Sequence, residues 1–185
     1  MPSGSIHTVP VVIEQVLALR PKSVLDLGTG VGKYGVLLRE YLEIQAGNFD
    51  FDQRRTVRID GVEAEKRLCW RQDSIYDRMF WMDLREFVAF RVEASRRTVE
   101  YDLALMTDVF EHLSREDGAK VVDSLKVLCR AILIVVPRDW FSNEVPGLPW
   151  ETHRTQWTLD DFRAFGMTAW EGVAGDLYGL WRGGT

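Results

Sequence analysis

The sequence has few cysteines, no run of positive charge and no long apolar segment. Its two cysteines, Cys69 and Cys129, lie far apart with no C-x-x-C spacing, so we expect small buried residues in a reducing compartment rather than a disulfide framework. Lysine and arginine never occur more than two in a row, and the net charge is −5. This excludes the basic footprint that grips a nucleic-acid backbone. The apolar stretch "VPVVI" stops at Glu14, too soon for a signal segment or a membrane span. The sequence therefore predicts a cytoplasmic protein without a nucleic-acid or membrane partner.

The length and composition of the chain are those of a compact domain. A chain of 185 residues is long enough to bury about 70% of the surface of its unfolded form. The sequence shows no internal repeat, low-complexity tract or linker, so we predict a single domain over residues 1–185.

Apolar periodicity predicts strands and helices in alternation. Strands are expected at 23–27, 57–63, 79–82, 102–107, 131–136, 167–173 and 176–182, and helices at 8–19, from 33, at 65–71, from 83, from 114 and from 158. Three of the helix starts have cap residues, namely Asp83 with Glu86, Ser114 with Asp117, and Thr158 with Asp161. The alternation indicates an α/β fold with a doubly wound, mostly parallel seven-stranded sheet and helices on both faces. The last two strands have no helix between them and should form an antiparallel hairpin at one edge.

The stretch "DLGTGVGKYG" (26–35) carries four glycines directly behind the first strand. It can be interpreted as G-x-G-x-G from Gly28, a loop for a nucleoside-bearing cofactor, or as the dinucleotide motif G-x-G-x-x-G from Gly30. The strand ends at Leu27, so Gly28 takes the first position of the loop. The acidic strand end Glu63 also follows later than the ~20 residues typical of dinucleotide sites. Both observations favour G-x-G-x-G.

Three segments resemble motifs of the class I S-adenosylmethionine-dependent methyltransferases. "VLDLGTGVGKYG" is similar to the first motif of that family, "IDGVEAE" to the second and "DLALMTDVFEHL" to the fourth. The resemblance covers nearly the whole chain from Ser23 onward, including the closing hairpin. It implies the Rossmann-like methyltransferase fold and S-adenosylmethionine as cofactor.

The resemblance also implies a set of cofactor-binding residues: Asp26, Gly28, Thr29, Gly30, Glu63, Asp83, Leu84, Thr107 and Asp108. The first four would lie near the methionine end, Glu63 would accept hydrogen bonds from the ribose diol, and Asp83 would accept from the adenine amine. Thr107 and Asp108 would end the fourth strand beside the reacting methyl group. Simpler structural roles stay open for three of them. Glu63 could be a solvated strand end, Asp83 only a helix cap, and Asp26 an acceptor for the loop's own amides.

The acceptor side is expected around two histidines and one long loop. The connection formed by residues 137–157 is far longer than usual and rich in aromatic residues. We therefore predict that it is a lid over the acceptor pocket, with Trp140, Phe141 and Trp150 as walls of that pocket. His112 and His153 are the candidate catalytic residues, because imidazole accepts protons near neutral pH. Passive roles for both stay open.

A metal is not predicted, although "DVFEHL" invites a site through Asp108, Glu111 and His112. No second histidine or carboxylate cluster stands at ligand spacing in the sequence. The 48–56 stretch has no functional interpretation.

The sequence thus predicts a methyltransferase that moves the methyl group of S-adenosylmethionine to an oxygen, nitrogen or carbon atom of a small-molecule acceptor. Such an enzyme gains most from positioning its reactants and excluding water. The alternative is a catalytically idle nucleoside-binding or regulatory protein on the same fold, and a nicotinamide oxidoreductase comes third. The oligomeric state is not predicted.

Overall fold

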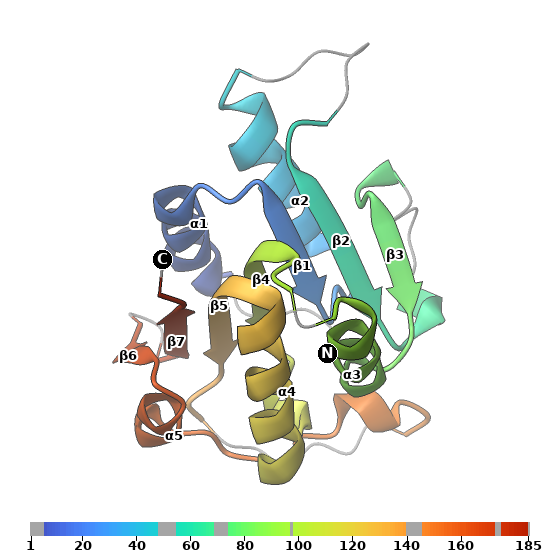
Figure 1. The fold of residues 1–185 in the computed structure, drawn as a ribbon. Coiled ribbons are helices and arrows are strands. Elements are labelled where there is room, and N and C mark those ends of the chain that lie inside the picture. Colours follow the sequence, from blue (N-terminus) through green and yellow to red (C-terminus); the bar gives the residue numbers. More distant parts are fainter. Residues whose placement is uncertain are drawn as a thin grey trace.

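The seven strands form one sheet with the order β3-β2-β1-β4-β5-β7-β6 (Figure 1). The computed structural model describes residues 6–47, 55–68, 74–96, 98–139, 146–172 and 175–184. The strands are β1 (Ser23–Leu27), β2 (Arg58–Glu63), β3 (Arg78–Trp81), β4 (Tyr101–Thr107), β5 (Cys129–Val136), β6 (Thr168–Glu171) and β7 (Leu177–Arg182). The first five pair in parallel, and β7 runs antiparallel to both β5 and β6. The predicted fold class and the edge hairpin are confirmed.

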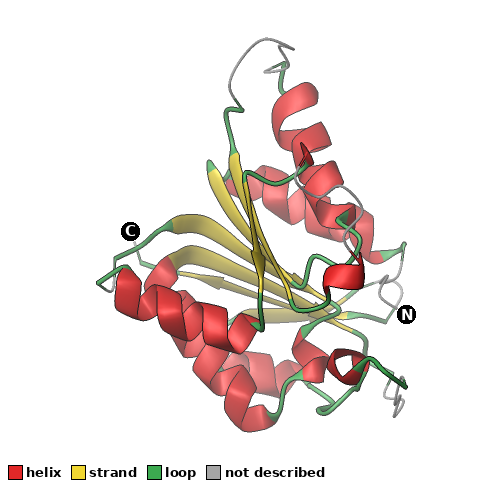
Figure 2. Ribbon diagram, turned by 90° about the vertical axis from the view of Figure 1, so that its right-hand side faces the viewer, coloured by secondary structure: helices red, strands yellow, loops and turns green. Residues whose placement is uncertain are grey.

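Helices cover both faces of the sheet (Figure 2). The helices are α1 (Thr8–Leu19), α2 (Lys33–Arg39), α3 (Leu84–Ala94), α4 (Arg115–Leu128) and α5 (Leu159–Ala164), with a π-helix η1 (Glu40–Ile44) and the 3-10 turns η2 (Lys66–Leu68), η4 (Phe110–His112) and η5 (Pro149–Glu151). Side chains of α1 and α2 pack on one face, and those of α3, α4 and α5 on the other. Along β5, Ile132 and Ile134 belong to one core and Leu133 to the other, as expected for a strand buried on both sides.

The predicted helix caps are present, with one change of partner. Ser114 accepts a hydrogen bond from the backbone of Asp117, and Thr158 forms a full capping box with Asp161. Asp83 also caps its helix, but its carboxylate accepts from the backbone N–H of Arg85 rather than pairing with Glu86 as expected. The salt bridge from the Arg85 side chain, at 2.6 Å, reinforces that choice.

Some expectations differ from the structure or fall outside its described part. The helix expected at 65–71 is only a single 3-10 turn at Lys66–Leu68, with 69–73 not described. Cys129 is buried as a free thiol, whereas Cys69 and most of the 48–56 stretch lie outside the described residues. None of the described helices is long and apolar enough to cross a membrane.

Candidate functional site

A cavity of about 130 Å³ lies beyond the carboxyl ends of the central parallel strands. The strand order changes direction between β1 and β4, and ligands of open α/β sheets bind at such a switch point. Its wall includes eight of the nine residues that the family resemblance implies for the cofactor: Gly28, Thr29, Gly30, Glu63, Asp83, Leu84, Thr107 and Asp108. The ninth, Asp26, is not part of the wall.

The glycine loop takes the backbone shape that the G-x-G-x-G interpretation requires. Gly28, Gly30 and Gly32 all have positive φ, at 74°, 54° and 88°. Residues other than glycine rarely adopt this backbone conformation. The N–H of Gly28 donates to the Val62 carbonyl at 2.8 Å and fixes the loop against β2. Gly35 serves another purpose, since it lies in α2 where an added Cβ would be 2.5 Å from the Tyr76 ring. Gly28, the first residue after β1, opens the loop, as the G-x-G-x-G interpretation expects.

Glu63 joins the end of β2 to the glycine loop. One carboxylate oxygen accepts from the backbone N–H of Gly30 and the other from that of Glu65, each at 2.8 Å. Burial raises the pKa of Glu63, and these backbone donors counteract part of the rise. Each oxygen keeps a further lone pair for a ligand hydroxyl. Glu63 is thus a buried, oriented acceptor in the cavity wall and not a solvated strand end.

Asp26 is a buried residue of β1, two positions before Gly28. Its side chain accepts a hydrogen bond from the Tyr76 hydroxyl at 2.6 Å and is 2% exposed. Burial raises its pKa to about 7, opposed by the Tyr76 hydrogen bond, with smaller effects of Glu63, which raises it, and Lys33, which lowers it. The partner is therefore a tyrosine rather than the loop amides that the structural alternative expected. Tyr76 was not identified from the sequence, because nothing in its neighbourhood marks it as a partner of a residue so far away.

Asp83 combines a structural role with a place at the cavity. It caps α3 and bonds Arg85, and together with Leu84 it borders the cavity. Burial alone would raise the pKa of Asp83, but its hydrogen bonds with Arg85 lower it below the usual value. The carboxylate stays charged near neutral pH and can accept a hydrogen bond from a ligand.

The end of β4 carries a carboxylate in a strained conformation. Asp108 has φ of 56°, and its N–H donates to the Val135 carbonyl at 3.0 Å. Burial raises its pKa to about 6, with Lys33 lowering it and Asp176 raising it. Within the described part of the chain, its Oδ2 is buried without a hydrogen-bond partner. Strain of this kind gathers at functional sites.

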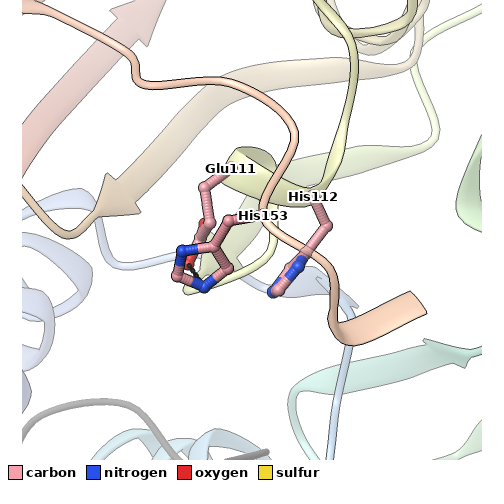
Figure 3. Close-up of side chains that lie close together, drawn as sticks. All are labelled: Glu111, His112 and His153. Atoms are coloured by element: carbon pink, nitrogen blue, oxygen red, sulfur yellow. Dashed lines mark ion pairs between the residues drawn. The ribbon is translucent and has the colours of Figure 1, made fainter. Parts of the chain in front are cut away.

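The two predicted histidines are neighbours in space. The rings of His112 and His153 lie 4.9 Å apart between centroids, inclined at 70°, and His153 Nε2 is 4.0 Å from a carboxylate oxygen of Glu111 (Figure 3). His112 lines the cavity, whereas His153 is not among the residues that line it. Burial lowers the pKa of His112, offset in part by backbone groups of Thr152 and Asp108. Burial therefore favours the neutral form of this imidazole over the charged one.

The segment after η5 is docked on η4, and this brings His153 to its place. The backbone N–H groups of Arg154 and Thr155 donate to the Glu111 carbonyl at 2.8 and 3.1 Å. Farther on, the Trp157 indole donates to the Phe110 carbonyl and stacks on its ring. No second histidine stands at ligand spacing in the sequence, but the fold brings His153 next to Glu111 and His112.

The described part of the predicted lid borders the cavity. Pro149, Trp150, Glu151 and Arg154 contribute to its wall, and the segment passes below the carboxyl ends of the strands (orange in Figure 1). Trp150 is 44% exposed. The other two expected wall residues, Trp140 and Phe141, lie outside the described residues.

No protein-family model and no curated protein matches the sequence, whereas solved methyltransferase structures do. An O-methyltransferase family protein from Burkholderia thailandensis has a TM-score of 0.60 at 16% identity, over 96% of this chain and 55% of its own. The small RNA methyltransferase HEN1 has a TM-score of 0.61 at 13% identity, over 96% of this chain and 25% of its own. Magnesium protoporphyrin IX methyltransferase from Synechocystis PCC 6803, solved with bound S-adenosylmethionine, has a TM-score of 0.59 at 15% identity, over 96% of this chain and 78% of its own.

At these identities the likeness establishes the fold, which is that of the class I S-adenosylmethionine-dependent methyltransferases. The chain spans about half the length of the Burkholderia protein and a quarter of the RNA methyltransferase. The named acceptors of these proteins differ from one another, so the fold alone does not select a small molecule over RNA.

Proposed function

We propose that this protein is an S-adenosylmethionine-dependent methyltransferase whose single domain transfers the methyl group to an atom of a small-molecule acceptor. The observation that carries the proposal is the cavity at the switch point, where the glycine loop, Glu63 and Asp83 meet from three different strand ends. Each of these groups suits one part of the cofactor.

Glu63 is the anchor for the ribose. Its carboxylate is already oriented by Gly30 and Glu65, and its two oxygens can accept hydrogen bonds from both hydroxyls of a ribose diol. Asp83 and Leu84 border the same cavity, with a charged acceptor and an apolar side chain suited to the amine and the ring of adenine. The positive-φ glycines let the backbone approach the methionine end.

Methyl transfer needs little chemistry from the protein. An acceptor atom attacks the methyl carbon in line, the carbon–sulfur bond breaks, and the electron pair stays on sulfur. Positioning and exclusion of water supply most of the rate gain in such a reaction. The reacting side of the cavity is then the wall formed by Asp108 and His112. A neutral imidazole there can take a proton from an acceptor hydroxyl or ammonium.

The acceptor would lie between that wall and η5, where Trp150 offers an apolar surface. A small molecule is favoured over a nucleic acid by the net charge of −5 and by the lack of basic runs. The 146–157 segment acts in this proposal as a lid that closes over the acceptor.

Calorimetry with S-adenosylmethionine, S-adenosylhomocysteine and NAD tests the cofactor. We expect both sulfur nucleosides to bind, the demethylated product at least as tightly, and NAD not to bind. Binding of neither nucleoside would overturn the proposal. Transfer of a labelled methyl group to a metabolite extract then separates an enzyme from an idle nucleoside-binding protein, which would bind the cofactor and release no label.

A further inference from the structure

We propose that Glu111, His112 and His153 bind a divalent transition-metal cation at the edge of the cofactor cavity. One ligand atom from each of the three side chains lies within 4.8 Å of the others, and Figure 3 shows the two rings and the carboxylate turned toward a common space. Two of them come from η4 and the third from the 152–157 segment docked on it.

The distances suit a metal after small side-chain rotations. Nitrogen and carboxylate ligands lie about 2.0–2.2 Å from zinc, so two ligands of a tetrahedral ion are separated by roughly 3.3–3.6 Å. The distance between His153 Nε2 and the Glu111 carboxylate is 4.0 Å, and the three ligand atoms all lie within 4.8 Å of one another. Side-chain rotations on binding would have to bring these atoms together.

The donor set is typical of reactive metal sites. Two histidines and one carboxylate bind zinc in hydrolytic enzymes and iron in oxygenases, and in both cases they leave coordination positions open. Imidazole favours zinc, iron, copper and nickel, while the carboxylate also suits manganese. A first-row divalent cation is therefore the expected occupant, rather than calcium, which prefers oxygen ligands alone.

Unsatisfied buried groups at this place supply an independent argument. Glu111 is 3% exposed, and its Oε2 has no hydrogen-bond partner among the described residues. The same holds for the buried atoms Nδ1 of His112 and Oδ2 of Asp108. Buried polar atoms without partners are costly, and a buried carboxylate most of all. Besides burial, the nearby carboxyls Asp108, Glu151 and Asp176 disfavour a negative charge on Glu111. A divalent cation would remove this cost.

The backbone around the site is held independently of any ion. The Glu111 carbonyl accepts from Arg154 and Thr155, and the Thr155 hydroxyl donates to the Leu113 carbonyl at 2.7 Å. These bonds lock the two chain segments that supply the three ligands. The ligands are thus brought together by the fold, as a pre-organised metal site requires.

The cation would also define the acceptor, a step that rests on the proposed function. His112 lines the cavity, so the open positions of the metal would face the methyl group. They fit an acceptor with a hydroxyl oxygen, because coordination lowers the pKa of a bound hydroxyl. The proton leaves to solvent, the oxygen bonds to the methyl carbon, and the carbon–sulfur pair stays on sulfur. The histidines then act as ligands and the metal replaces a general base.

Cobalt(II) titration of the chelator-treated protein tests the site directly. We expect one cobalt ion per chain, with visible absorption bands of a nitrogen- and oxygen-ligated ion. The variants Glu111→Gln and His153→Ala should each weaken binding at least tenfold. Glu116→Gln is the matched control, because this glutamate lies on the exposed surface of α4 with Lys120, and it should bind like the wild type.

Two outcomes would overturn the inference: a wild-type protein that binds no cobalt, or variants that bind it unchanged. Circular dichroism establishes that each variant is folded. If Glu111→Gln does not fold, His153→Ala still tests the site, because His153 lies in a loop outside the core.

Nucleoside calorimetry on the same samples separates this inference from the proposed function. A protein that binds S-adenosylhomocysteine but no cobalt defeats only the metal site, whereas one that binds cobalt but neither nucleoside defeats only the cofactor assignment. Labelled transfer to hydroxyl and amine acceptors, with and without metal, tests the acceptor class. Transfer that prefers amines or ignores the metal would overturn the hydroxyl step.

Discussion

The cavity has a cofactor half, formed by the glycine loop, Glu63 and Asp83, and an acceptor half, formed by Asp108 and His112. The carboxylates of the two halves differ in their hydrogen-bond partners. In the cofactor half, Glu63 and Asp83 accept hydrogen bonds from backbone N–H groups of the loop and helix beside them. In the acceptor half, Asp108 in the wall and Glu111, which precedes the wall residue His112, each keep a buried oxygen without a partner among the described residues. The first half is complete before a ligand arrives and can hold a polar ligand in a fixed position. An acceptor molecule or a cation would compensate these two oxygens of the second half.

The largest effect is expected from breaking the loop of the cofactor half. Gly30→Val puts a β-branched side chain at φ of 54° in the cavity wall, a conformation such residues avoid. Cofactor binding should be abolished in calorimetry. Gly47→Val is the matched control, because Gly47 also has positive φ but no atoms within 4 Å of an added Cβ. That variant should lose stability and keep its affinity. A folded Gly30→Val protein with normal binding would reduce the loop to a tight turn.

The next largest effect is expected from the histidines, whose loss should affect turnover but not cofactor binding. His112→Ala and His153→Ala should lower turnover by about 100- to 10,000-fold, the range of general acid–base contributions, because the cation that they hold takes the place of a general base. Cofactor affinity should change less than about threefold. Steady-state kinetics with an acceptor and calorimetry on the same preparations measure the two. Wild-type rates in both variants would make the histidines bystanders, and catalysis would rest on proximity alone.

Glu63→Ala should mainly weaken cofactor binding, in contrast to the histidine variants. Loss of charge-assisted hydrogen bonds costs about 1.5–3 kcal/mol, or about ten- to a hundredfold in affinity for S-adenosylhomocysteine. Glu65→Ala is the control, since it retains the backbone N–H that Glu63 uses and removes a side chain paired with the exposed Arg67. If Glu63→Ala leaves the dissociation constant unchanged, the second motif has been misinterpreted.

The smallest effect concerns the buried Asp26 and depends on pH. Burial raises the pKa of Asp26 to about 7 in the folded state, against an ordinary value of 3.8 in the unfolded chain. The folded state therefore disfavours the charge, and this residue lowers stability as pH rises from about 4 to 7. Asp26→Asn keeps an acceptor for Tyr76 and removes that loss. In urea unfolding, the variant should gain roughly 1–3 kcal/mol relative to wild type between pH 5 and 8. Parallel pH curves would contradict the assignment.

Local sequence determined the architecture and the cofactor half. Strands and helices follow from the period of apolar residues, and the caps at Ser114 and Thr158 act within three residues. The family resemblance implied Glu63 and Asp83 as cofactor-binding residues, and because parallel strands bring their carboxyl ends to one edge, both border the same cavity as the glycine loop. The cap at Asp83 was predicted with the wrong partner. Its carboxylate accepts from the backbone N–H of Arg85 instead of pairing with Glu86.

Tertiary structure alone decided which distant side chains meet. Nothing in the sequence pairs Tyr76 with Asp26, and histidine spacing argued against the group of Glu111, His112 and His153. Both contacts depend on the path of long connections, which is set by many weak contacts such as the stack of Phe110 on Trp157 rather than by a local periodicity. A sequence pattern records which residues share an element. The distance between residues of different elements is decided only when those elements pack.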